Sequence, residues 1–534
     1  MRMKGFIMQR IKTRVVAILF AVTMAATVFI ALPMTAYADV GDIYIGGPAY
    51  DSTTDHSTAD WEWDSATNTL TLNSSYHEGS IEFTGATHAT IYIKLTGDVT
   101  IDSLSGYPAI SCTGGGGNYI FVTTFDHTLN VKANTADLDS VIDVNGTISF
   151  NAGTVNVTNE NPHGYGIRAV VGTVADHTQL NVVGAVISDG VAIDASSSSV
   201  LITGSVEAGG VGVQAFDGSN VEVSNGIIIQ HDDDDFNSIG VYAVTGSTVT
   251  VTSGGINLSN GTCYGIFAVD DGTEVFVAGE VNINTTAAGT GLYIWEGASV
   301  FVDGNVTVNS ALNGAAVVAE TGSKVDISGN AMSNTYGVFA ASASNVNITG
   351  DVKAAYGSVD AYSESQIDIG GDVYATDAGA TAVSAYDAFI NILGNVKATG
   401  VDSTGVLVEW DGQVTVDGTI TADTYISFGD IKINGVPYSP YTVTAADYDA
   451  STIKDGYLQY SITYLDDQGA EHTDYVWVKV IAAEVELPED EVDISTVPAT
   501  GDSMALEGGA AILMLLFAGA AALAWRRSAS KHLL

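Results

Sequence analysis

The chain has 534 residues, of which 62 are acidic and 17 are basic, and its formal net charge is −45 at pH 7. This excess of acid excludes nucleic acid as a partner, because phosphate binding needs clustered lysine and arginine. The 59 glycines follow no collagen period, so they are expected to mark turns.

Residues 1–38 are predicted to be a cleavable export signal. Five basic residues lie within the first fourteen, and an apolar stretch follows from Val15 to Leu32. Ala36 and Ala38 then provide the small-x-small pattern of a signal cleavage site. The alternative is an uncleaved membrane anchor, because the apolar stretch is close to the minimum length of a membrane span.

Residues 39–98 are predicted to form an N-terminal cap. The segment Trp61–Leu72 places tryptophans before an Asp- and Asn-containing turn and a strand with alternating leucines. A Gly-Asp-Val-Thr-Ile stretch follows at Gly97–Ile101. These stretches resemble clostridial surface proteins with carbohydrate-binding β-helices, and the likeness extends over about residues 55–430. The resemblance implies a calcium-assisted binder of acidic plant-type polysaccharide.

Residues 99–428 carry a repeat of about 24 residues, and such a period is typical of stacked architectures. A small or apolar residue closes the first strand of each clear repeat, at Ala169, Ala195, Ala215, Ala243, Ala268, Ile294, Ala319, Ala340, Ala361, Ala385 and Val408. Another apolar residue lies two positions earlier each time, and this period of two indicates strands with one face inward. The sequence therefore predicts an all-β fold, a right-handed parallel β-helix.

The repeat also predicts the number of coils and the distance between the two cysteines. About 13–14 coils fit the repeat, at about 4.8 Å for each rung. Cys112 and Cys263 are then about six rungs, or ~29 Å, apart. A disulfide needs Cα atoms within about 7 Å, so these cysteines are predicted not to be bonded to each other.

Four aromatic residues occupy the outward position of the first strand in nearby coils. They are Tyr242, Phe267, Tyr293 and Phe339, with Val318 between the last two. Stacked rungs would align them over about 19 Å, and a contiguous exposed apolar row usually marks a contact site. We expect a polysaccharide-binding face here. The alternative is a row covered by a long loop or a second copy, because tyrosine and phenylalanine also favour strands.

The densest acidic cluster lies in the longest insertion between coils. It consists of Asp232, Asp233, Asp234 and Asp235. Carboxylates in a flexible loop suit calcium, so these residues are a candidate calcium site. The alternative is a solvated loop tip, because no established calcium-loop motif is present.

Residues 429–480 lack the repeat but still alternate apolar and polar residues. This pattern predicts a small β module that closes the end of the solenoid. Residues 481–496 are rich in acid and are expected to form a linker to the C-terminal segment.

Residues 497–534 combine a short motif with an apolar stretch and a basic end. The motif is Val497, Pro498, Ala499, Thr500 and Gly501. It resembles the sortase sorting signal of Gram-positive surface proteins, in which leucine usually stands in place of the valine. The resemblance implies sortase and peptidoglycan as partners and a covalent link to the cell wall, with the membrane contacted only through this segment before processing. The alternative is a plain C-terminal membrane anchor.

Several functions remain compatible with these patterns. We expect a non-catalytic polysaccharide binder on the cell surface, and the alternatives are a protein-binding adhesin or a structural stalk. A pectin-type lyase or hydrolase is a further alternative, because such enzymes share the fold and fold does not determine function. The outward positions of the first strands offer one basic residue for that chemistry, Arg168, with Asp194 one coil further on.

Overall fold

The computed structural model describes residues 41–479 except for residues 85–89, 104–106, 113–118, 124–126, 134–139, 146, 151–153, 171–177, 231–236, 260, 430–431, 434–435, 438–440, 445–455 and 467. The predicted leader, linker and sorting signal lie outside the described residues. The described residues belong to one compact unit, Met1–Val480. All their regular elements are β-strands, and nowhere in the described ranges is there a helix long and apolar enough to cross a bilayer.

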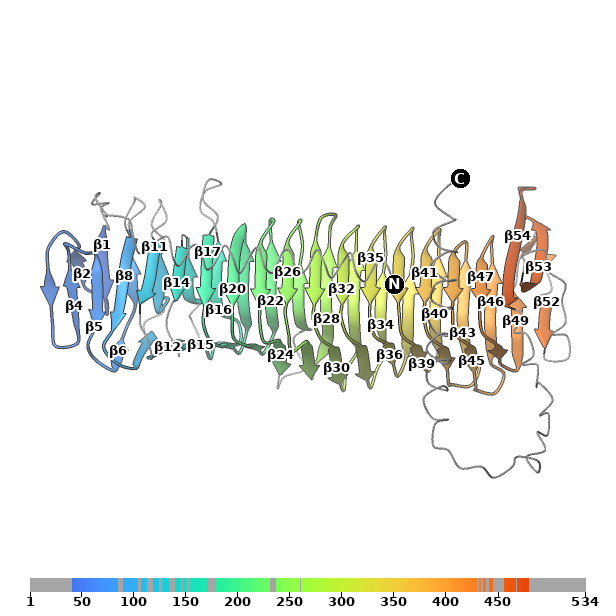
Figure 1. Ribbon diagram of the computed structural model, residues 1–534, viewed down its shortest axis with the longest axis horizontal. Coiled ribbons are helices and arrows are strands. Elements are labelled where there is room, and N and C mark those ends of the chain that lie inside the picture. The colour runs from blue at the N-terminus through green and yellow to red at the C-terminus, as the bar shows by residue number, and fades with distance from the viewer. Residues whose placement is uncertain are drawn as a thin grey trace, which may run out of the picture. The chain divides into compact units, whose positions relative to one another are not determined.

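Three parallel sheets form the walls of a solenoid (Figure 1). The third sheet contains fifteen strands, from β6 (Tyr76–Glu78) to β48 (Ile420–Thr421), and each is parallel to the strand three positions further along the chain. This arrangement is a parallel β-helix, so the fold prediction is confirmed. All strands of this sheet except β6 lie within 99–428.

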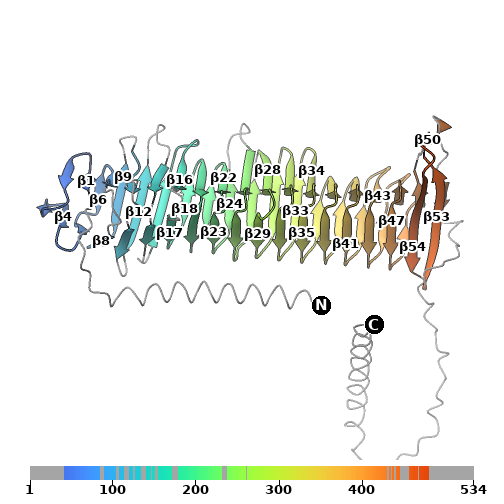
Figure 2. The same cartoon turned by 90° about the horizontal axis from the view of Figure 1, so that it is seen from above.

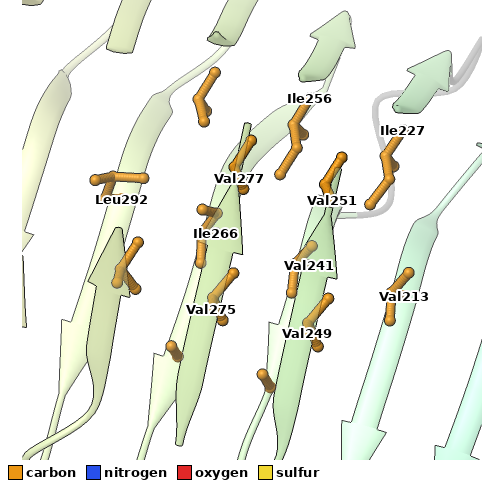
Figure 3. Close-up of a cluster of buried hydrophobic side chains, with 14 of the residues drawn as sticks. Val213, Ile227, Val241, Val249, Val251, Ile256, Ile266, Val275, Val277 and Leu292 are labelled. Atoms are coloured by element: carbon orange, nitrogen blue, oxygen red, sulfur yellow. The ribbon is translucent and has the colours of Figure 1, made fainter. Parts of the chain in front are cut away.

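One coil consists of three short strands, one in each wall. β25 (Asn237–Ala243) lies in the first sheet, β26 (Thr248–Val251) in the second and β27 (Ile256–Ser259) in the third. Valine, isoleucine and alanine side chains from all three walls fill the interior and are fully buried (Figure 3). Burial of each valine or isoleucine side chain stabilises the folded state by about 1.5–3 kcal/mol relative to leaving it in water. The core continues from rung to rung, so each coil depends on its neighbours for stability.

The stacking begins earlier than the predicted boundary at residue 99. β5 (Thr69–Leu72) pairs in parallel with β8 (Thr90–Leu95), and β6 and β7 (Ile81–Phe83) also pair in parallel with the next coil. The first coil therefore starts at Thr69, inside the segment predicted as a cap. The reason is that this segment already has the inward alternation of a coil, since Leu70 and Leu72 are fully buried.

The tryptophan-containing stretch of the N-terminal segment has a structural role. β4 (Trp61–Asp64) pairs with β5 in an antiparallel hairpin. The side chain of Trp63 is 1% exposed, and its indole N–H donates a hydrogen bond to the Ser52 carbonyl oxygen, with an N–O distance of 2.9 Å. The indole of Trp61 packs edge-on against Tyr50. This stretch therefore anchors the end of the solenoid rather than presenting rings to solvent.

A long hairpin lies at the other end of the solenoid (Figure 2). β53 (Tyr457–Leu465) and β54 (Glu471–Lys479) pair in an antiparallel manner over their whole length. β54 also pairs in parallel with β47 (Gln413–Val416), so it occupies the place of the next rung in the second sheet. The hairpin thus covers an edge of the second sheet that would otherwise be open to pairing with another chain.

The two cysteines lie in the same sheet but far apart. Cys112 ends β10 (Ile110–Cys112), and Cys263 lies in β28 (Thr262–Val269). Successive pairings from β10 to β28 cross six rungs. The two residues form no disulfide, so both the predicted spacing and the absence of a bond between them are confirmed.

Candidate ligand-binding surfaces

The predicted aromatic row lies on the outer face of the first sheet. Tyr242 is in register with Phe267, which is in register with Tyr293 on β31 (Gly289–Trp295). Their ring centroids are 5.4 Å and 5.0 Å apart. Phe216 extends the row at 5.6 Å from Tyr242, and Tyr264 packs edge-on against Phe267. These five residues form a continuous half-buried surface, here called the first-sheet ladder.

The fourth predicted member, Phe339, belongs to a separate row. Val318 stands between Tyr293 and Phe339 in register and interrupts the ring contacts. Phe339 instead contacts Tyr362, with ring centroids 5.4 Å apart. The second row continues through Tyr386 and Trp410. Sequence analysis missed these last three rings, although Tyr362 and Tyr386 each directly follow an alanine that closes a first strand.

Ring orientation determines what the first-sheet ladder presents to a ligand. The planes of Phe267 and Tyr293 differ by 19°, so the two rings stack face to face. One face of each of these two rings is therefore covered by the other ring. Burial raises the pKa of Tyr293, and the nearby charge of Glu320 raises it further. The hydroxyl thus remains protonated and can donate or accept a hydrogen bond.

The basic residue considered for lyase chemistry is held by a carboxylate. The Arg168 Nε lies 4.0 Å from Asp194 Oδ2, and the two residues are in register on adjacent rungs. Burial raises the pKa of Asp194, although Arg168 opposes this shift. In the second row, burial raises the pKa of Asp360 to about 6. Asp360 is in register with Phe339 and so places a carboxyl group beside the aromatic rings.

The predicted metal and processing sites fall outside the described residues. These are Asp232, Asp233, Asp234 and Asp235, the cleavage residues Ala36 and Ala38, and the sorting motif from Val497 to Gly501. Within the described ranges, no group of three or more histidine, cysteine, aspartate or glutamate side chains is placed to hold a metal ion.

A titratable cluster lies at the junction of the solenoid and the C-terminal hairpin. His472 Nδ1 is 2.6 Å from Asp411 Oδ2, and its Nε2 is 3.5 Å from Asp466 Oδ2. The hydrogen bond with Asp411 raises the pKa of His472. Asp474 is fully buried and accepts a hydrogen bond from the Gly412 N–H at 3.2 Å. Burial raises the pKa of Asp474 to about 7.

This cluster predicts that the C-terminal end is more stable in mild acid. The native state holds the proton of Asp474 more tightly than the unfolded chain, so stability falls as pH rises from about 4 to about 7. The raised pKa of His472 acts in the same direction. We expect Asp474→Asn to raise the unfolding temperature at pH 8 and to flatten its dependence on pH, as measured by circular dichroism between pH 5 and pH 8.

The control for this experiment is Asp303→Asn, because Asp303 is exposed and lies far from Asp474 in the sequence, between β32 (Ser299–Val302) and β33 (Val306–Ser310). Protonation of many surface carboxylates also relieves repulsion in a chain of net charge −45. Subtracting the pH dependence of the unfolding temperature of the Asp303 variant from that of the Asp474 variant removes this general effect of charge repulsion. Equal pH dependence in both variants would contradict the role given to Asp474.

The second sheet carries an open groove of about 560 Å³ near the C-terminal hairpin. It crosses β41 (Gln366–Ile369), β44 (Phe389–Ile392), β47, β54 and β53. The lining consists of uncharged side chains: Gln366, Phe389, Asn391, Gln413, Thr415, Gln459 and Trp477. Sequence analysis singled out none of them.

The arrangement thus offers two kinds of surface, an aromatic ladder on the first sheet and an amide-rich groove on the second. Comparison with protein-family models, with curated proteins and with solved structures finds no match for this chain.

Proposed function

We propose that this protein is exported, linked to a Gram-positive cell wall, and binds polysaccharide through its β-helix without catalysing a reaction. The observation that carries the binding proposal is the first-sheet ladder, in which aromatic rings follow one another on successive rungs. A linear polysaccharide also repeats along its length, so it can make the same contact several times. Repeated weak contacts of this kind add up to useful avidity.

The chemistry of the ladder also fits a sugar polymer. Sugars present C–H groups and hydroxyl groups together, and the half-buried ladder likewise combines apolar aromatic rings with the hydroxyl groups of Tyr242, Tyr264 and Tyr293. Location at the cell surface is supported by the sequence signals at both ends of the chain. We further propose that calcium bound by Asp232–Asp235 assists the binding of an acidic polymer, because carboxylates on both partners would otherwise repel.

The direct test is to apply the full-length chain, in mild detergent, to a glycan array and to a panel of extracellular-matrix proteins. Both are probed with calcium and with a chelator. Binding to glycans alone supports the proposal, and loss of binding to acidic glycans in chelator supports the calcium role. Binding confined to proteins would favour the adhesin alternative and would overturn the proposal.

We expect Tyr242→Ala combined with Tyr293→Ala to reduce retention on the best array polysaccharide by at least tenfold. The reason is that the double change removes two of the five rings and both of their hydroxyls from the ladder. Affinity electrophoresis in gels that contain the polysaccharide measures this effect. Circular dichroism checks that the strands persist.

The matched control is Phe276→Ala combined with Phe301→Ala. These two rings also stack on adjacent rungs, 5.2 Å apart, but on the second sheet. The control pair should leave retention unchanged. If both double variants bind alike, the ladder is not the contact surface.

A further inference from the structure

The groove of the second sheet has two aromatic walls and a polar floor. Phe389 lies on β44 and Trp477 on β54, and β47 lies between them. Two strand spacings separate β44 from β54 by about 9.6 Å, and Trp477 lies two residues further along β54 than Tyr475, which is level with Phe389. Gln413 is in register with Phe389, and Thr415 is in register with Trp477, so both belong to the floor. The side chain of Phe389 is 45% exposed, which leaves much of its ring available to a ligand.

Two amides along the groove are held in fixed orientations by one carboxylate. Gln366 Nε2 donates to Asp368 Oδ2 at 2.7 Å, and Asn391 Nδ2 donates to Asp368 Oδ1 at 2.8 Å. An ionised carboxylate only accepts hydrogen bonds, so each amide must turn its NH₂ group toward Asp368. The amide oxygens of Gln366 and Asn391 are then oriented acceptors. Such fixed groups lower the entropic cost of binding a ligand.

The far wall of the groove is also fixed before a ligand arrives. The indole N–H of Trp477 donates to Gln459 Oε1 at 3.0 Å. One face of the indole also stacks on Tyr475, with ring centroids 5.0 Å apart and planes within 4°. This pair forms a rigid aromatic platform, and the Gln459 amide is oriented beside it with its NH₂ group as a donor.

We propose that this groove is a binding subsite for a short stretch of neutral polysaccharide. This proposal rests on the proposed function, and it adds to the first-sheet ladder a second surface that binds a different class of sugar. Flat apolar rings pack against the C–H faces of sugar rings, and planar amides and a hydroxyl match sugar hydroxyls as both donors and acceptors. The groove is open to solvent, so a sugar chain can enter it from outside.

Charge selects a neutral sugar over an acidic one. None of the seven lining residues is charged, and Asp368 lies beside two of them, Gln366 and Asn391, and accepts a hydrogen bond from each. A uronic acid or sulfated sugar would therefore meet a carboxylate with no lysine or arginine among the lining residues to compensate. The whole chain adds to this repulsion, with a net charge of −45. Without a metal ion, the groove is therefore expected to bind neutral sugars and to exclude acidic ones. The first-sheet ladder is proposed to bind acidic sugars with the help of calcium.

The test uses the full-length chain and soluble hexasaccharides, and the Tyr242 and Tyr293 double variant separates binding in the groove from binding at the first-sheet ladder. Isothermal titration compares neutral gluco-, manno-, xylo- and galacto-hexasaccharides with hexagalacturonate, all in chelator at 0.15 M salt. Phe389→Ala should weaken binding of the best neutral sugar by about tenfold. Gln413→Glu should also weaken it, because an ionised carboxylate only accepts hydrogen bonds and cannot replace the NH₂ donor of the floor amide. Leu393→Ala is the matched control, since Leu393 is 65% exposed and follows the same strand outside the groove.

Each outcome decides the assignment. Neutral binding that Phe389→Ala and Gln413→Glu weaken and Leu393→Ala leaves intact supports the subsite. Neutral binding lost instead in the Tyr242 and Tyr293 double variant overturns the subsite and keeps the proposed function. Preference for hexagalacturonate in chelator overturns the subsite as well. No binding by any sugar here or on the array would remove both proposals.

Discussion

Substitution of Thr500 by alanine is expected to move the protein from the cell-wall fraction to the membrane fraction and the medium. If the proposed sorting signal acts, the peptide bond between Thr500 and Gly501 would be broken, and the Thr500 carbonyl would form a new amide with an amino group of peptidoglycan. The sequence predicts an extended recognition segment at Pro498, because proline disfavours helix at its own position and just before it. The expected effect is a fall of the wall-linked fraction from most of the exported protein to almost none.

Cell fractionation followed by mass spectrometry of the C-terminal peptide measures this effect. In the natural chain we expect the peptide to end at Thr500 and to carry a peptidoglycan fragment. Thr496→Ala is the matched control, since Thr496 precedes the motif by one residue and should leave wall attachment intact. Equal wall linkage in the Thr500 and Thr496 variants would rule out the sorting signal and favour a plain membrane anchor.

Attachment by this route would change the charge of the mature protein. The leader carries five basic residues, and the segment after Thr500 carries three basic and two acidic residues. The processed chain would keep nine basic and sixty acidic residues, a net charge of about −51. Such a surface repels acidic polymers unless cations intervene. Because of this charge, we propose that a neutral sugar binds in the groove of the second sheet, and that an acidic sugar binds at the first-sheet ladder with the help of calcium.

The sequence predicts the core of the solenoid well, because burial follows the parity of the repeat. Ile167, Val241 and Leu292 all stand two positions before the residue that closes a first strand, and all three are fully buried. A period of two fixes which face each side chain occupies. The coil length then fixes the register of whole rungs, and the spacing of the two cysteines follows from it.

The candidate surfaces were predicted only in part, because ring contacts depend on more than register. The outward row at Tyr242, Phe267 and Tyr293 follows from the repeat, and the structure aligns these residues. Val318 interrupts this same column, and the ring that contacts Phe339, Tyr362, belongs to a second column of outward residues. The repeat length predicts which residues align on successive rungs, but it does not predict how their rings are oriented or which neighbouring ring each one contacts.

The groove of the second sheet could not be predicted from the repeat at all. Trp477 lies in a strand recognised from its alternation, but it pairs with Thr415 across a sequence separation that no period connects. Gln459 joins the groove only through the hairpin that folds β53 onto β54. A binding surface built where the repeat ends therefore requires the three-dimensional structure.

Successive rungs of the solenoid approach so closely in the first sheet that Gly265 has no room for a side chain. Gly265 is buried in β28, and a Cβ atom there would lie 2.5 Å from the Gly291 carbonyl oxygen and 2.5 Å from Val281 Cγ1. Gly240 meets the Gly265 carbonyl oxygen in the same way one rung earlier. These distances are shorter than van der Waals contact, so any side chain must push the rungs apart or shift the core.

Gly265→Val is therefore expected to lower stability by more than the about 1–3 kcal/mol that is usual for overpacking a core, with Gly265→Ala intermediate. Alanine is already present in the equivalent position of another rung, at Ala316, which is why the smaller change is expected to be tolerated. Limited proteolysis in increasing urea measures the effect, because separation of two rungs exposes both halves of the core. Gly97→Val is the matched control, since a Cβ atom there meets nothing within 4 Å. Equal resistance of the Gly265→Val and Gly97→Val variants would contradict the close stacking of the rungs.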